Sequence, residues 1–203
     1  MARSMAPKQD TAARILEAAD EVIGEVGYDA ASVADIAARA QVNKALVFYY
    51  FNSKPELLER VLERYYTAHA EALAAAVAST GSLRDRLHNM MDAYMDFIAA
   101  NRRYPRLVQH LVSSGDVHHV LIQRNLRPLF EWITNALGDA VPASGHLAAR
   151  QFFVTFSGAV INYFTYAPVL ENMWGEDPLS DHSLAERRAH LHWMVDTFLD
   201  ALA

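Results

Sequence analysis

Apolar residues recur every three or four positions along almost the whole chain, a spacing that gathers them on one face of a helix. No segment of useful length alternates between apolar and polar residues as a strand would. Apolar residues make up 52% of the chain, which is enough for a folded core. The pattern therefore predicts an all-α protein of about nine helices.

Capping residues, glycine and proline divide this pattern into separate helices. Side chains that can cap a helix start are Asp10 or Thr11, Ser32 with Asp35, Asn43, Ser82 with Asp85, and Ser183 with Glu186. Gly27 should end the first helix, and Pro55 and Pro105 should open later ones. The predicted helices cover about residues 11–26, 33–40, 44–51, 55–79, 83–101, 105–114, 117–137, 146–166 and 184–202. Residues 1–10 are expected to form a disordered basic arm.

The second and third helices are separated by only three residues, "QVN" at positions 41–43. Two short helices joined by so tight a turn form a helix-turn-helix pattern, whose second helix can enter the major groove of DNA. On a helix from Lys44, Val47 and Phe51 lie four positions apart and face the core. The outward face then carries Lys44, Ala45, Phe48 and Tyr49, with Leu46 and Tyr50 on its flank.

The outward side chains carry groups that suit DNA. Lys44 can donate to guanine or to a phosphate, and the small Ala45 allows a close approach to base edges. Leu46 can touch a thymine methyl group, while tyrosine hydroxyls can donate to phosphates. Lys54 stands where the next helix begins, so that its charge and the first amides of that helix can bind another phosphate.

The stretch "SVADIAARAQVNKALVFYYFNSKPELL" resembles the DNA-binding domain of the TetR family of bacterial transcriptional regulators. The family pattern has a Thr or Ser cap, an Ile-Ala pair, a three-residue turn, an aromatic-rich recognition helix and a following Lys. The matching positions are Ser32, Ile36, Ala37, Val42, Phe48, Tyr50, Phe51 and Lys54. Leu46, Phe48 and Tyr50 depart from the commonest family residues, so the operator sequence does not transfer.

The resemblance implies a helix-turn-helix domain over residues 11–54 and a helical ligand-binding and dimerisation domain over residues 55–203. It also implies a ligand-responsive regulator, most often a repressor, that leaves a palindromic double-stranded operator when a small molecule binds. Activation is the alternative, because the position of the operator relative to the promoter decides whether binding represses or activates transcription. The residues expected to contact DNA are Ser32, Asn43, Lys44, Ala45, Leu46, Phe48, Tyr49, Tyr50 and Lys54.

A two-fold operator requires two recognition helices about 34–36 Å apart, and hence a homodimer. The resemblance implies that the last two long helices pair with their copies. The candidate interface residues are Phe152, Phe153, Phe156, Val160, Phe164, Leu191, Met194, Val195 and Phe198. The alternative is that these faces close only the core of a single chain.

The resemblance also implies an effector inside the C-terminal domain. Candidate lining residues are Met91, Tyr94, Met95, Phe97, His110, Trp132, Asn162, Tyr163, Tyr166 and Trp174. This mixture favours a mostly apolar or aromatic molecule with few polar anchors. The alternative is that each of them belongs to the core or to the dimer interface.

Other classes of protein have weaker support. The net charge of −6 excludes a uniformly basic nucleic-acid coat, so DNA contact must be local. Twenty uncharged residues, 151–170, reach membrane-span length, but their polar members favour a helix buried against its own subunit and a partner. His88 with Asp92 and His192 with Asp196 fit solvated pairs better than metal ligands, and no cofactor or enzyme motif occurs. A helical-bundle carrier or enzyme without DNA binding is the competing function, and the absence of cysteine suits the cytoplasm.

Overall fold

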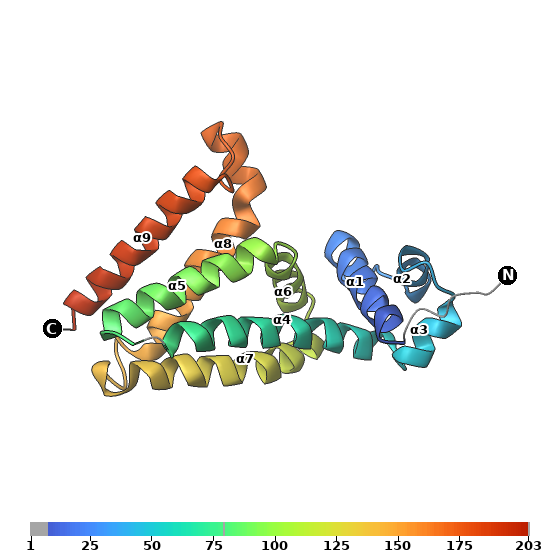
Figure 1. Ribbon diagram of the computed structural model, residues 1–203, viewed down its shortest axis with the longest axis horizontal. Coiled ribbons are helices and arrows are strands. Elements are labelled where there is room, and N and C mark those ends of the chain that lie inside the picture. The colour runs from blue at the N-terminus through green and yellow to red at the C-terminus, as the bar shows by residue number, and fades with distance from the viewer. Residues whose placement is uncertain (1–7, 79, 203) are drawn as a thin grey trace. The chain divides into compact units, whose positions relative to one another are not determined.

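The computed structural model describes residues 8–78 and 80–202, and over them the chain is helical without strands (Figure 1). The helices are α1 Lys8–Val26, α2 Val33–Arg39, α3 Lys44–Tyr50, α4 Lys54–Val77, α5 Leu83–Ala100, α6 Tyr104–Ser113, α7 Asp116–Leu137, α8 Ala149–Trp174 and α9 Asp181–Asp200. A single 3-10 turn, Gly138–Ala140, follows α7. The prediction of an all-α fold with about nine helices is confirmed.

Three of the predicted helix starts, at Ser32, Asn43 and Ser82, are present as capping interactions. Ser32 accepts the Asp35 amide at 3.1 Å while the Asp35 carboxylate accepts the Ser32 amide at 3.3 Å. Ser82 and Asp85 form the same reciprocal box before α5. These caps depend only on residues three positions apart, which is why sequence alone could identify them.

The remaining boundaries differ from the prediction at both ends of the chain. α1 begins at Lys8, so the last three residues of the predicted arm are helical, and residues 1–7 lie outside the described part. α9 is capped by Ser180, which accepts the Ser183 amide at 3.2 Å. The predicted cap at Ser183 is therefore wrong: its hydroxyl donates instead to the Asp177 carbonyl at 2.9 Å. The cap of α9 thus lies three residues earlier than predicted, at Ser180.

α8 is longer and more exposed than the sequence indicated. It continues through Pro168 to Trp174 and ends at Gly175, whose φ of 75° suits glycine. By length and composition it is the one described helix that could cross a membrane, although core helices pass the same test. Only 28% of its most apolar window is buried within the chain, so the expectation of a helix buried on nearly all sides does not hold for a single chain.

The described chain forms two compact units. The first contains residues 8–65 and 106–122, and the second contains residues 66–105 and 123–202. In the first unit, the buried Asp20 on α1 accepts a hydrogen bond from the Tyr65 hydroxyl at 2.6 Å and from Arg64 at 3.1 Å. These bonds join α1 to the first half of α4, so a buried charge sits with both a cation and a hydroxyl donor.

In the second unit, α8 and α9 both pack on α5. α5 and α9 carry the same residue types at the same four-residue spacing. These are Arg84, His88, Asp92 and Asp96 on α5, and Arg188, His192, Asp196 and Asp200 on α9. We call this set the α5–α9 ladder. Its pairings are antiparallel, because Arg84 near the start of α5 meets Asp196 and Asp200 near the end of α9, whereas Arg188 meets Asp92 and Asp96.

The ladder corrects the expected histidine pairs. His88 pairs with Asp196 at 2.8 Å and His192 with Asp92 at 2.8 Å, so each histidine bonds across the seam rather than along its own helix. The two imidazole rings stack at 4.2 Å with an interplanar angle of 1°. Burial alone would raise the pKa of Asp196, but hydrogen bonds from the neighbouring arginine and His88 hold it below its ordinary value. The ladder thus fixes α9 in register on α5.

A buried histidine lies in the core of the second unit. The imidazole of His69 on α4 stacks between the rings of Tyr94 and Phe97 on α5, with both centroid distances 4.6 Å. The ring is 4% exposed, and neither of its nitrogens has a hydrogen-bond partner within the described residues. Burial lowers the pKa of His69 to about 4, so the ring is neutral at pH 7.

The low pKa of His69 predicts an acid-sensitive core. The unfolded-state pKa is about 6.5, so the unfolded chain binds the proton more tightly than the folded chain between about pH 6.5 and 4. This contribution to the free energy of unfolding should be fully retained above about pH 6.5 and should fall by about 3 kcal/mol as the pH approaches 4. Urea unfolding of the parent chain and His69→Leu near pH 7 and near pH 4.5 measures it, and the variant should lose less stability on acidification.

The control for this measurement is His182→Gln, because His182 is exposed near the start of α9. Its pH dependence should match that of the parent chain. Equal losses in the parent and His69→Leu would show that His69 does not carry the effect.

Candidate functional site

The turn between α2 and α3 is closed by backbone and side-chain hydrogen bonds. The Val42 amide donates to the Ala37 carbonyl at 2.9 Å. Gln41 has φ of 55°, the one positive value at a non-glycine residue in the described chain. The guanidinium of Arg14 on α1 donates to the Ala40 carbonyl at 2.5 Å, which satisfies an end group of α2. Neither Gln41 nor Arg14 was identified from the sequence, since the turn geometry and this long-range bond leave no local pattern.

Two buried side chains hold α3 against the rest of the first unit. Val47 is 1% exposed and Phe51, the C-cap residue, is 6% exposed. Ile36 on α2 is also buried, and α2 and α3 pack together. The side-chain oxygen of Asn43 accepts the Leu46 amide at 2.8 Å and begins the helix. These anchors leave the opposite face of α3 free.

The outward face of α3 agrees with the predicted spacing. Lys44 and Ala45 are exposed, Phe48 is 41% exposed and Tyr49 is 66% exposed. Leu46 and Tyr50 are half-buried on the flank. The four consecutive aromatic residues are therefore divided between a core and a surface. Their contacts with DNA stay predictions.

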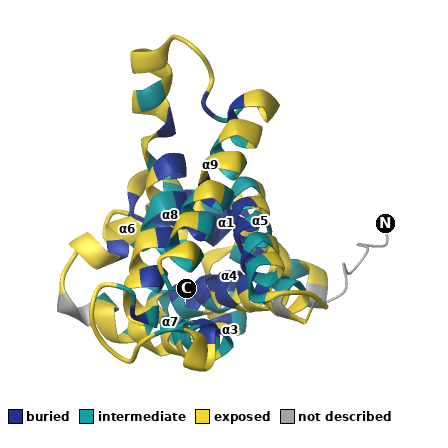
Figure 2. Ribbon diagram, turned by 90° about the vertical axis from the view of Figure 1, so that its left-hand side faces the viewer, coloured by how far each residue is buried: buried dark blue, intermediate teal, exposed yellow. Residues whose placement is uncertain are grey.

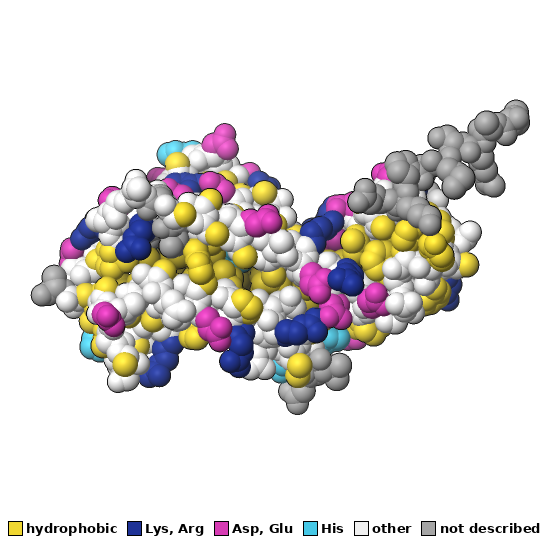
Figure 3. Space-filling view, turned by 60° about the horizontal axis from the view of Figure 1, so that its bottom comes forward, with side chains coloured by type: hydrophobic (Ala, Val, Ile, Leu, Met, Phe, Trp, Pro, Cys, Tyr) yellow, Lys and Arg dark blue, Asp and Glu magenta, His cyan; other side chains and the backbone are white. Residues whose placement is uncertain are grey.

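Aromatic and cationic groups of this face touch one another. The rings of Tyr49 and Tyr50 meet edge to face at 5.2 Å, and the Lys44 ammonium lies 5.8 Å from the centroid of Phe48. Figure 3 shows hydrophobic side chains gathered over the N-terminal helices, at the right of the view, with charges of both signs beside them. On the face in view, a local patch rather than a positive coat is what could meet DNA.

Lys54, the first residue of α4, is held by its own unit. Its ammonium lies 4.3 Å from the Tyr28 ring centroid and donates to the Asp29 carbonyl at 3.3 Å. The Glu56 carboxylate lies at the same helix start, where it accepts the Asn52 backbone and side-chain amides at 3.1 and 2.8 Å. Binding of a DNA phosphate at the start of α4 would therefore depend on the Lys54 ammonium, because the Glu56 carboxylate already lies at the helix terminus.

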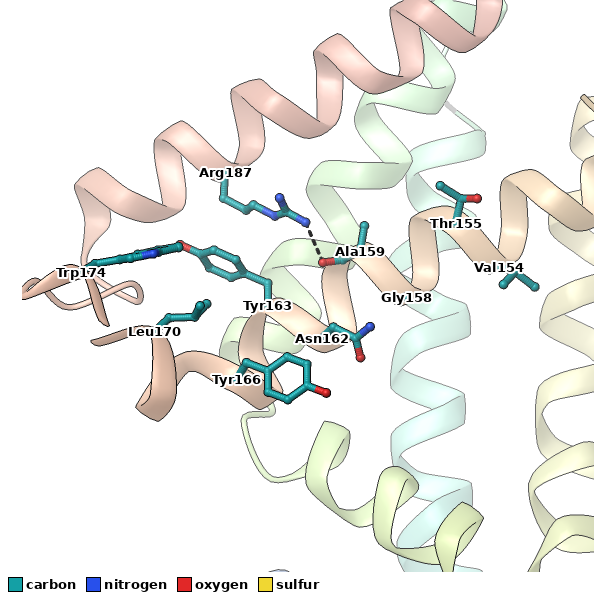
Figure 4. Close-up of a pocket in the computed structure, with 10 residues that line it drawn as sticks. All are labelled: Val154, Thr155, Gly158, Ala159, Asn162, Tyr163, Tyr166, Leu170, Trp174 and Arg187. Carbon is teal, nitrogen blue, oxygen red and sulfur yellow. Dashed lines mark hydrogen bonds between the residues drawn. The ribbon is translucent and has the colours of Figure 1, made fainter. Parts of the chain in front are cut away.

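A groove of about 470 Å³ lies along α8 and the first turns of α9 (Figure 4). Four of the ten residues expected to contact an effector line it. These are Asn162, Tyr163, Tyr166 and Trp174. Tyr166 is 52% exposed, so the groove is open to solvent in the single chain. Its size is that of a small-molecule site.

One basic side chain reaches this groove from α9. The guanidinium of Arg187 donates to the Ala159 carbonyl at 2.8 Å and lies 5.0 Å from the Tyr163 ring centroid. Burial lowers the pKa of Arg187, partly offset by Tyr163, and its Nε has no hydrogen-bond partner among the described residues. The sequence did not indicate Arg187 as a lining residue, because helical periodicity does not show which residue of another helix reaches a groove. The groove thus combines aromatic walls with one cation.

The other six effector candidates do not gather in this groove. Met91, Tyr94, Met95 and Phe97 are buried in the core of the second unit, and Trp132 is half-buried on α7. His110 belongs to the first unit, where its ring faces Gly27. The candidates were chosen by residue type, which does not distinguish a lining residue from a core residue.

Most of the candidate dimer residues are buried within the single chain. Phe152, Phe156, Val160, Phe164, Leu191 and Val195 are all below 7% exposed, whereas Phe153, Met194 and Phe198 are half-buried. The first six therefore serve the chain's own core, because the most regular apolar stripe of each helix faces its own unit. Figure 2 shows exposed stretches along α8 and α9. The large exposed apolar side chains of these two helices are Val154, Tyr166, Val169, Met173, Trp174 and Trp193.

Comparison with known proteins connects this geometry with a family. Residues 15–61 match the family described as bacterial regulatory proteins, tetR family. The HTH-type transcriptional activator FasR of Mycolicibacterium smegmatis is 34% identical over 145 residues, which cover 71% of this chain and 65% of FasR. The HTH-type transcriptional repressor Rv3405c of Mycobacterium tuberculosis is 28% identical over 87% of this chain and 84% of its own length.

A solved structure extends the likeness beyond the helix-turn-helix. The transcriptional regulator FadR from Bacillus subtilis, solved in complex with stearoyl-CoA, aligns with a TM-score of 0.68 over 94% of this chain and 96% of its own. Its 18% sequence identity supports a shared fold alone. The segment that matches the family, residues 15–61, contains α2 and α3 with their caps Ser32 and Asn43. The chain therefore belongs to the TetR family of bacterial regulatory proteins.

Proposed function

We propose that this chain regulates transcription by placing α3 in the major groove of a two-fold DNA operator. The observation that carries the proposal is the division of α3, in which buried Val47 and Phe51 turn Lys44, Phe48 and Tyr49 outward. We propose repression that a small molecule relieves; of the two relatives compared above, Rv3405c is named a repressor and FasR an activator. Such a role belongs in the cytoplasm, where the DNA is.

The outward residues divide between base reading and positioning. Lys44 would donate to guanine or to a phosphate, while Ala45 and Leu46 would lie against base edges. Tyr49 and Tyr50 would donate to phosphates beside the groove. Ser32 and Asn43 already cap α2 and α3, so they would act on DNA mainly by fixing the two helices.

Loss of the Lys44 ammonium should weaken operator binding. Lys44→Ala removes an exposed cation without disturbing the buried side of α3, so affinity should fall about tenfold or more. The slope of log affinity against log salt should become shallower by about one unit. Fluorescence anisotropy with a labelled operator fragment measures both.

Arg60→Ala is the matched control, because it removes an equal charge from an exposed position on α4. This variant should keep most of the operator affinity. If the two variants lost affinity equally, a general loss of positive charge would explain the result better than a specific contact. No preference of the parent chain for any DNA would favour a helical carrier or enzyme instead.

We also propose a homodimer, which would hold two α3 helices about 34–36 Å apart on successive turns of DNA. Its support is the set of exposed apolar side chains on α8 and α9, which a folded chain in water rarely leaves uncovered. Val169, Met173 and Trp193 are 55, 72 and 60% exposed and lie outside the groove lining. These residues replace the buried ones named from the sequence.

A charge on this surface should separate the two copies. Met173→Glu would place a carboxylate where the partner is expected, and sedimentation velocity should then give the mass of one chain instead of two. Val120→Glu adds the same charge at a 71% exposed valine on α7 and should leave the dimer intact. A parent chain that sediments as a monomer, or a Met173→Glu variant that stays dimeric, would contradict this interface.

We propose that the α8–α9 groove holds the effector, a mostly apolar or aromatic molecule. The supports are its volume of about 470 Å³ and its aromatic lining by Tyr163, Tyr166 and Trp174. Arg187 would hold an anionic group of that molecule, since no carboxylate lines the groove beside it. Effector binding would lower DNA affinity by its preference for a form that does not fit the operator.

Stearoyl-CoA is a suitable first probe, because it is bound in the structure of Bacillus subtilis FadR. A binding effector should weaken the operator complex by about 5- to 150-fold, the range expected for a coupling of 1–3 kcal/mol. Tyr166→Ala should reduce this response, whereas Val120→Ala should not. If Tyr166→Ala instead changed the oligomeric state and left the response intact, a second copy of the chain would be the occupant of the groove.

A further inference from the structure

A cluster in the first unit joins the end of α1 to α4, α6 and α7. Its members are Tyr28 in the loop after α1, Lys54 at the start of α4, His110 on α6 and His118 on α7. All four belong to one compact unit, although His110 and His118 are more than fifty positions beyond Lys54 in the chain. Only Lys54 has a role in the proposed contact with DNA. The other three side chains therefore need an explanation of their own.

The Lys54 ammonium is placed by an aromatic face rather than by a carboxylate. It lies over the Tyr28 ring with 4.3 Å to the centroid and gives one hydrogen bond, of 3.3 Å, to the Asp29 carbonyl. An ammonium has three donors, so this arrangement leaves capacity for a phosphate oxygen. A ring face attracts the cation without neutralising it, whereas an ion pair would compete with DNA.

Tyr28 is itself held from a different element. Its ring is 9% exposed and meets the ring of His118 edge to face, with a centroid distance of 4.9 Å and an interplanar angle of 79°. Burial, with a smaller contribution from Asp29, raises the pKa of Tyr28, so the phenol is neutral and cannot pair with Lys54 as an anion. The ring can therefore act on Lys54 only through its position.

The loop that carries Tyr28 is closely packed on α6. Gly27 has φ of 82°, and a β-carbon added to it would lie 2.5 Å from Nε2 of His110. Such a contact is too short for any side chain, so glycine allows the loop to approach the imidazole. His110 was considered for the effector site on sequence grounds, and its place against Gly27 gives it a different role. The loop is thus fixed by α6 beneath Gly27 and by α7 beside Tyr28.

We propose that Tyr28 is a positioning residue for the phosphate contact of Lys54, and that His118 and His110 hold Tyr28 in place. This inference rests on the proposed binding of DNA through Lys54. It makes DNA affinity depend on residues 106–122, which contain no predicted DNA contact. A displacement of the end of α6 or the start of α7 would alter DNA affinity through the contacts of His118 with Tyr28 and of Tyr28 with Lys54.

A double-mutant cycle on operator affinity tests the inference. The parent chain and three variants are titrated with a labelled operator fragment. The variants are Tyr28→Leu, Lys54→Met and the double substitution. Tyr28→Leu removes the ring face and should weaken binding about three- to tenfold, the size of a partly desolvated cation–π contact. In the Lys54→Met background the same substitution should have almost no effect, because the ammonium that it positions is gone.

Two further variants separate positioning from a general loss of structure. Tyr28→Phe keeps the ring and should bind like the parent chain. His118→Leu removes the edge contact with Tyr28 from a half-buried site. It therefore tests the same series of contacts if Tyr28→Leu fails to fold. It too should weaken binding in the parent background and have little effect beside Lys54→Met.

The possible results are distinct. The inference would be overturned if Tyr28→Leu and His118→Leu each weakened binding as much in the Lys54→Met background as in the parent chain. A purely structural loss would give that result. Failure of Tyr28→Phe to bind would do the same. If Lys54→Met bound as tightly as the parent chain, the phosphate contact and this inference would both be wrong, while a loss in Lys44→Ala would leave the proposed function standing.

Discussion

The burial of Val47 and Phe51 beneath α3 is the constraint on which DNA recognition depends. α3 has only seven residues, too few for a helix to be stable by itself in water. Its conformation must therefore come from these two anchors and from the Asn43 cap at its start. Because a helix fixes the angle between its residues, burying one side determines which residues point outward. Core packing and surface chemistry are two consequences of one arrangement.

The α5–α9 ladder has a comparable role in the second unit. Both α8 and α9 pack on α5, and the cross-seam bonds of Arg188 and His192 fix the register of α9. These groups are about one-third exposed, so their value lies in specifying one alignment more than in adding stability. With α9 held on α5, the groove remains along α8, and exposed apolar residues such as Met173 remain on its surface.

Local patterns could be read from the sequence, whereas long-range partners could not. The box at Ser32 and Asp35 and the cap at Asn43 involve neighbours three positions apart, so their geometry follows once a helix begins. The inward position of Val47 followed from helical period alone. By contrast, His88 has an aspartate four positions away in its own helix and bonds instead to Asp196, which only the packing of α9 brings near.

At the candidate interface and pocket, the sequence left open whether each residue belongs to the chain's own core. Phe152 and Phe156 are large and apolar, which suits either a core or a dimer, and only the packing of α8 assigns them to the core. The groove was partly foreseen through Asn162 and Tyr166, but Arg187 reaches it from another helix.

The most direct test of DNA recognition by α3 is selection of genomic fragments by the purified chain. Affinity for the best fragment and for unrelated DNA is then measured at several salt concentrations. Recognition by α3 predicts an enriched two-fold sequence bound at least about a thousandfold more tightly than unrelated DNA at physiological salt. Equal affinity for all fragments would contradict sequence-specific recognition by α3.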